Sequence, residues 1–140
     1  MVRVAAALVT IALVGIGCGG AEAELPPPVF PAAALVTTST AAGMTIAVWS
    51  SPQPPAKGLA AFQFAFTDGA GAPVDGLTVD VLPWMPAHGH GGSTHPTATA
   101  TAPGIFLVQP VSFFMSGAWE LRTMIGGQRD DAVTVDVDVR

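Results

Sequence analysis

Cysteine and charge are both scarce in this sequence. One of its 140 residues is cysteine and 11% are charged, whereas 50% are hydrophobic. A single cysteine can form neither an internal disulfide nor a thiolate zinc cluster, so disulfide scaffolds and zinc ribbons are excluded. Ten acidic residues against five basic ones leave a net charge of −5, which disfavours nucleic acid and anionic lipid as partners. The length suits one domain.

The N-terminal hydrophobic run is too short to cross a membrane. Residues 4–17 carry no charge, but a spanning helix needs a longer stretch of about 20 residues. Behind the positive side chain of Arg3, the run has the size of a signal-peptide core. We therefore expect residues 1–17 to be a signal peptide and the protein to be exported to the cell envelope.

Two cleavage sites compete at the end of this run. Cys18 directly follows it and resembles the lipid-attached cysteine of bacterial lipoproteins, although Gly15 stands where such signals usually carry leucine. The alternative is cleavage after Ala23, which would release a soluble periplasmic protein. We favour the lipoprotein, because a lone cysteine followed by two glycines suits a tether.

A proline-rich segment follows the cysteine. Pro26, Pro27 and Pro28 prefer the extended polyproline II conformation and resist packing. We therefore expect residues 18–32 to be a lipid-anchored spacer, and residues 33–140 to form the folded domain.

The rest of the chain alternates between apolar and polar residues. This period of two is typical of strands with one buried face, and no stretch after residue 32 has a convincing helical period. Strands are expected near residues 45–49, 62–67, 77–81, 97–101, 105–108, 119–125 and 133–139. Glycine-rich turns separate them, and residues 126–130 predict a hairpin between the last two. The sequence therefore predicts an all-β fold, an immunoglobulin-like antiparallel β-sandwich of about seven strands, with a small closed barrel as the alternative.

All three histidines lie in one short segment, as His88, His90 and His95. In an extended stretch His88 and His90 point the same way, and the glycines after them would let the chain fold back and bring His95 near. Met85 adds a thioether just upstream. Imidazole and thioether with no acidic residue between Asp80 and Glu120 favour copper, particularly Cu(I). Zinc with three histidines and a water is the weaker candidate.

A flexible polar loop is the plainer interpretation of the same segment, since glycine, serine, threonine and proline are loop formers. Met85 taken alone is more typical of packing beside Trp84. Catalysis is not expected, because Ser93 lacks both a nucleophile elbow and an acidic residue that would orient a histidine base.

Two motifs resemble a known family. The run MPAHGHG at residues 85–91 and the run FFMSGAWEL at residues 113–121 resemble the YtkA-like domains of bacterial envelope proteins, and Pro96 and the run GIF at residues 104–106 fit between them. The likeness spans residues 58–125. It implies an exported immunoglobulin-like sandwich linked to copper handling, whose partner is a copper-accepting or respiratory-oxidase-related envelope protein. By motif match it implies His88, His90 and Met115 as ligands.

The chain departs from that pattern at three positions. Gly92 stands where members often have methionine, Phe114 where they have histidine, and Ser116 where they have proline. Two potential ligands are therefore missing, and His95 is a candidate to compensate.

We accordingly predict an envelope-anchored copper carrier or accessory protein, not an enzyme, with the candidate ligands His88, His90, His95, Met85 and Met115. A protein-interaction or structural module of the envelope that binds no metal is the alternative. The two differ in whether the histidines and Met115 converge on one point.

Overall fold

The computed structural model describes residues 26–140, which form nine strands and no helix. The strands are β1 (Val36–Ser39), β2 (Thr45–Ser51), β3 (Gly58–Thr67), β4 (Leu77–Met85), β5 (His90–Gly91), β6 (Thr97–Ala102), β7 (Ile105–Phe113), β8 (Gly117–Gly127) and β9 (Asp131–Val139). No helix in this described part is long and apolar enough to cross a membrane.

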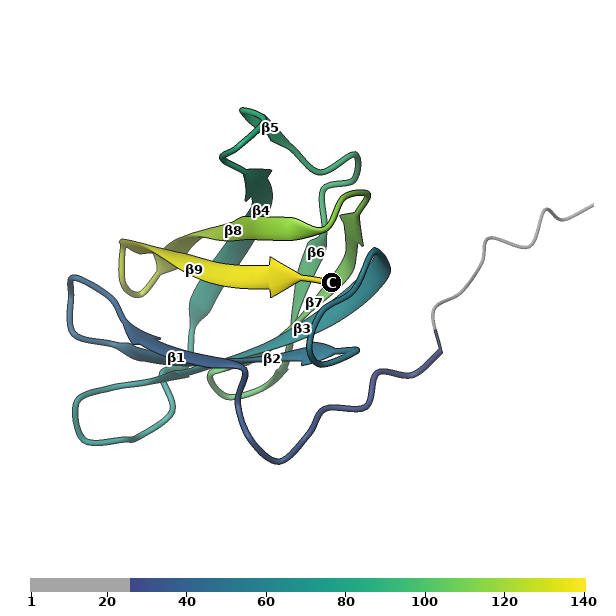
Figure 1. Cartoon of the computed structure of the whole chain (residues 1–140). Coiled ribbons are helices and arrows are strands. Elements are labelled where there is room, and N and C mark those ends of the chain that lie inside the picture. Colours follow the sequence, from purple (N-terminus) through teal and green to yellow (C-terminus); the bar gives the residue numbers. More distant parts are fainter. Residues whose placement is uncertain (1–25) are drawn as a thin grey trace, which may run out of the picture.

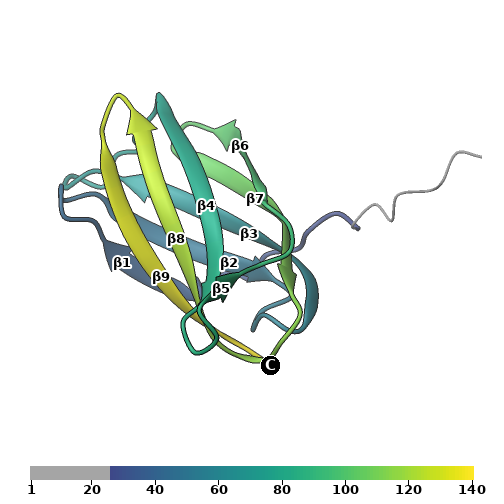
Figure 2. The same cartoon turned by 90° about the horizontal axis from the view of Figure 1, so that it is seen from above.

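The strands form two sheets, in the orders β1-β2-β3-β7-β6 and β5-β4-β8-β9, and every neighbouring pair is antiparallel. Figure 1 shows the two layers, and Figure 2 shows β4, β8 and β9 side by side across the strands of the other sheet. The orders β2-β3-β7-β6 and β4-β8-β9 match the A-B-E-D and C-F-G sheets of immunoglobulin domains. The predicted immunoglobulin-like sandwich is therefore confirmed, and the closed barrel is excluded.

The core lies between the two sheets and is filled by the buried side chains of the alternating patterns. Phe62, Phe64 and Phe66 of β3 are at most 1% exposed. Phe66 meets Phe106 of β7 edge to face, with ring centroids 5.7 Å apart. Val135 of β9 closes the core from the other sheet and is fully buried. Since apolar burial contributes roughly 25 cal/mol per Å², this alternation is the main stabilising feature of the fold.

The seven predicted strands correspond to β2, β3, β4, β6, β7, β8 and β9, including the predicted hairpin between β8 and β9. Sequence periodicity missed β1 and β5. The short β1 lacks an apolar alternation, and β5 has two residues. Both depend on pairing with a longer neighbour, β2 for the first and β4 for the second.

The predicted signal peptide, Cys18 and the alternative cleavage site after Ala23 lie outside the described residues. The end of the predicted spacer is described. There, Pro26, Pro27 and Pro28 line a hollow together with Leu59, and the Val29 N–H donates to the Ser51 hydroxyl at 3.2 Å.

Candidate functional site

The histidines at positions 88 and 90 belong to a tight turn that joins β4 to β5. We call residues 85–92 the histidine turn; it extends from one end of the sandwich (Figure 1). Met85 and His90 are paired across the two strands. The backbone N–H groups of His88 and Gly89 both donate to the Met85 carbonyl, at 3.2 and 3.0 Å. Gly89 has a φ of +67°, a left-handed conformation that closes the turn and favours glycine.

The glycines after His90 let the returning chain lie directly on β4. A Cβ atom at Gly91 would stand 3.1 Å from the Pro83 carbonyl oxygen, which is tighter than most real contacts. The Gly92 N–H donates to the same carbonyl at 3.0 Å. His90 is therefore held against the sandwich and is partly buried, whereas His88 at the tip of the turn is exposed.

The two imidazoles of the turn lie side by side. Their ring centroids are 5.7 Å apart and their planes are inclined by 36°. Two imidazoles that bind one ion at about 2 Å place their centroids roughly 5 to 6 Å apart, so the pair has suitable spacing for a shared ion. The Nδ1 atom of His90 lies 3.3 Å from the Gly91 carbonyl oxygen. Because a carbonyl only accepts, this long hydrogen bond favours a proton on Nδ1 and leaves Nε2 free as a ligand.

A series of packed aromatic rings connects His90 to the core. His90 stacks on Phe114 at 5.3 Å, and Phe114 meets the buried Trp119 edge to face at 5.3 Å. Trp119 in turn packs on Phe113 at 5.2 Å, and its indole N–H donates to the Met115 carbonyl at 3.0 Å. The histidine turn is thus connected to the core through the β7–β8 loop.

Both predicted thioether ligands lie against the core. Met85 is 4% exposed and belongs to the core cluster, and its methyl group would lie 3.3 Å from a Cβ added to Gly117. Met115 is partly buried and packs against the same cluster. The contacts of both side chains are therefore those of packing residues.

His95 is held at a different place from the other two histidines. Its Nε2 lies 2.7 Å from a carboxylate oxygen of Asp80 on β4, and both side chains are well exposed. Across residues 26–140, no three His, Cys, Asp or Glu side chains are grouped so that they could hold a metal ion. The chain does fold back after the glycines, but it brings His95 to Asp80 and forms no three-histidine site.

The match to a family model settles the relationship of this chain to known proteins. The model, described as YtkA-like, matches residues 38–124, more than half of the chain. The chain belongs to the YtkA-like family. The resemblance found in the two motifs is confirmed, and the matched span contains the histidine turn, Phe114, Met115 and Trp119. No curated protein and no solved structure matches the chain.

Two residues of this YtkA-like site were missed by sequence reasoning. Phe114 counted only as a lost ligand, yet its ring positions His90. Asp80 lies fifteen positions before His95 in the chain and carries no local signal that would join them. The described site offers one pair of imidazoles. His88 is open to solvent, and the ring of Phe114 stacks on His90.

Proposed function

We propose that this YtkA-like protein is an envelope-anchored carrier or accessory factor that binds one Cu(I) ion through His88 and His90 and performs no catalysis. The observation that carries the proposal is the 5.7 Å separation of the two imidazole rings on a turn whose backbone is closed by two hydrogen bonds. Because the backbone hydrogen bonds hold the turn, both imidazoles are close together before an ion binds. Less conformational entropy is then lost on binding.

The chemistry of the donors favours copper in its lower oxidation state. Structural zinc sites take four ligands, and catalytic ones take three protein ligands with a water. The described residues provide no group of three such donors. Cu(I) is softer and accepts fewer ligands, and imidazole suits it. Met115 is the candidate for a third, thioether ligand that the family motif suggests, after a rotation of its side chain away from the core.

The environment of the turn suits a carrier. His88 is exposed at the tip, so an incoming partner can approach the ion from that side. We propose no catalytic role, since the segment around Ser93 carries no nucleophile-elbow motif. Export and lipid attachment at Cys18 would tether the domain to the membrane through the proline-rich spacer. A copper-accepting or respiratory-oxidase-related envelope protein is the proposed partner.

The test is a competition between the purified full chain and a Cu(I) chelator, with Cu(II) and Zn(II) measured in parallel. The variant His88→Ala/His90→Ala removes both ligands. The matched control is His95→Ala, which removes the third histidine together with its contact to Asp80. We expect one Cu(I) ion per chain, binding weakened by at least about a hundredfold in the double variant, and a change below about twofold in the control.

Equal binding by the double variant, or no binding by the native chain, contradicts the proposal and leaves an interaction or structural module. Loss of binding in His95→Ala would show that the third histidine is a ligand after all. Tighter binding of Zn(II) than of Cu(I) would contradict the choice of metal.

A further inference from the structure

The strands β4, β8 and β9 have one buried face and one face exposed to solvent. The side chains on the exposed face alternate along each strand with the buried ones, and we call this surface the outer face. Met124 is 63% exposed and Leu82 is 38% exposed, although both are large apolar residues. The charged members of the outer face are Asp80, Glu120, Arg122, Asp136 and Asp138, and Trp84 lies on the same face.

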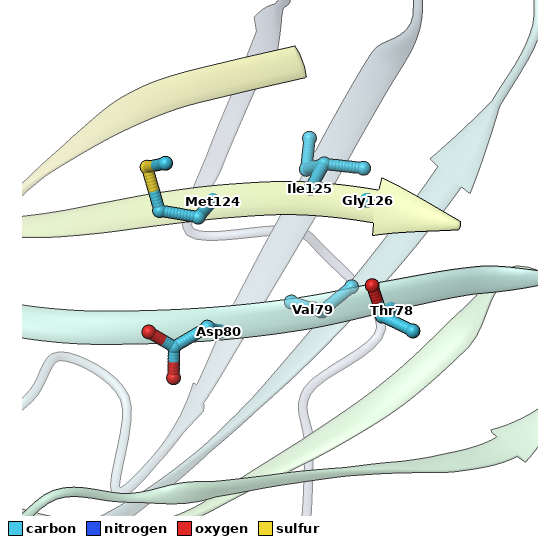
Figure 3. A pocket seen from close by; sticks show the side chains of 6 residues that line it. All are labelled: Thr78, Val79, Asp80, Met124, Ile125 and Gly126. Carbon is cyan, nitrogen blue, oxygen red and sulfur yellow. The ribbon is translucent and has the colours of Figure 1, made fainter. Parts of the chain in front are cut away.

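Met124 stands between two shallow hollows. One is lined by residues 78–80 of β4 and 124–126 of β8, and Figure 3 shows Met124 and Asp80 beside each other at one end of it. The other is lined by residues 122–124 of β8 and 132–134 of β9. Exposed methionine is frequent on protein-binding surfaces, because its flexible thioether side chain adapts to different partners.

The charges of the outer face are strongly one-sided. Its carboxylates are Asp80, Glu120, Asp136 and Asp138, against the single guanidinium of Arg122. Asp80 already contacts the His95 ring at 2.7 Å, which leaves Asp136 and Asp138 as the carboxylates open to a partner. That guanidinium is already engaged, because its Nε donates to Glu120 at 2.8 Å and it lies 4.5 Å from the centre of the Trp84 ring.

Two carboxylates of the outer face lie opposite each other. Glu120 and Asp136 are directly opposite each other in the β8–β9 pairing, and like charges in such a position destabilise a sheet. Asp138 lies two residues further along the same face of β9. A partner that supplies positive charge would relieve this repulsion when it binds.

We propose that the outer face is a docking surface for a basic segment of another protein. Apolar side chains of that segment enter the two hollows beside Met124, and lysine or arginine side chains meet Asp136 and Asp138. Charge complementarity selects this occupant. A second copy of the chain and an anionic lipid surface both carry negative charge and would be repelled. The proposal is independent of metal binding, because it uses no residue of the histidine pair.

The test follows the methionine methyl groups of the full chain by NMR after methyl-13C labelling. The probe is a ten-residue peptide of alternating lysine and leucine, and the control peptide has glutamate in place of lysine. Met124→Leu assigns the exposed signal, and the buried Met44 and Met85 serve as internal references, being at most 4% exposed. We expect the basic peptide to shift the Met124 signal in a saturable way and to leave both references unchanged.

Two further measurements separate specific docking from general attraction. Asp136→Asn/Asp138→Asn should weaken binding by about tenfold, and so should raising the salt from about 50 mM to about 300 mM. Asp68→Asn/Asp75→Asn removes two carboxylates from the β3–β4 loop and should change binding by less than about twofold.

Three results would overturn the proposal. The first is no shift at Met124 with up to about 1 mM basic peptide. The second is an equal shift with the acidic peptide or with vesicles of anionic lipid. The third is a shift that depends on protein concentration without any peptide, which would make the outer face a contact between copies.

Discussion

The imidazole of His90 stacks on the ring of Phe114, with centroids 5.3 Å apart and planes inclined by 28°. The contact joins the β4–β5 turn to the loop between β7 and β8, which are far apart in the chain. Because Phe114 also packs on the buried Trp119, the orientation of one candidate ligand depends on the core.

Phe114→Ala tests this dependence. Removing the ring eliminates two aromatic contacts, each worth about 0.5 to 1.5 kcal/mol, on a side chain that is 45% exposed. We expect the free energy of unfolding to fall by about 1 to 2 kcal/mol and the amide hydrogens of the histidine turn to exchange faster. Hydrogen exchange and chemical denaturation measure the two effects. Met124→Ala, at an exposed position of β8 opposite Asp80, is the control, and faster exchange in both variants would contradict a specific role of Phe114.

Gly89 tests whether the backbone of the turn holds the two histidines in place. Its φ of +67° disfavours residues with a Cβ, and a Cβ there would meet nothing within 4 Å. Gly89→Ala should therefore cost about 1 kcal/mol through backbone strain alone, and it should weaken Cu(I) binding by displacing His88. Gly89→Asn is the matched variant, because asparagine tolerates the left-handed region better and should recover part of both losses. Equal effects of alanine and asparagine would mean that the strain has another origin.

Asp131 should make the stability depend on pH. A hydrogen bond from the Thr40 side chain, followed by bonds from the Ala132 and Ala42 N–H groups, lowers the pKa of this carboxyl below its ordinary value of 3.8. A carboxyl with a lowered pKa in the folded state contributes stability above its unfolded pKa, and this contribution is lost as the pH falls through the folded value. The native chain should therefore be more stable than Asp131→Asn near pH 6, and the difference should shrink as the pH falls below the ordinary pKa of 3.8 and through the lowered pKa of the folded state.

Thermal unfolding at a series of pH values measures that difference. Thr40→Val should reduce the same pH-dependent part, since the threonine hydroxyl is the main cause of the lowered pKa. A difference between native chain and Asp131→Asn that stays constant from pH 6 to pH 3 would assign the effect to something other than the charge of Asp131.

Much of the fold could be predicted from the sequence, because the information is local. Alternation in runs such as 133–139 indicates a strand with one buried face wherever that strand finally pairs. The strand β5 could not be found in this way. Its two residues, His90 and Gly91, form a strand through their pairing with Met85 and Trp84 of β4.

The candidate site was only partly predictable, because only some of its contacts join residues that are close in sequence. His88 and His90 are neighbours in sequence, and a turn between them suffices to bring the rings together. The position of His95 depends on where the chain passes after the turn, and a carboxylate on β4 binds it there. Spacing alone could not show that the side chains of Met85 and Met115 pack against the core, because that contact forms only when the two sheets close.

By itself, the sequence determined the all-β architecture, the YtkA-like family and the place of the histidine turn, because each depends on patterns within a few residues. Only the tertiary structure decided that Phe114 stacks on His90, that Asp80 contacts His95 and that the exposed Met124 lies opposite Asp80. These relationships join residues from different strands and loops. They arise when the two sheets close over a common core, which no local pattern specifies.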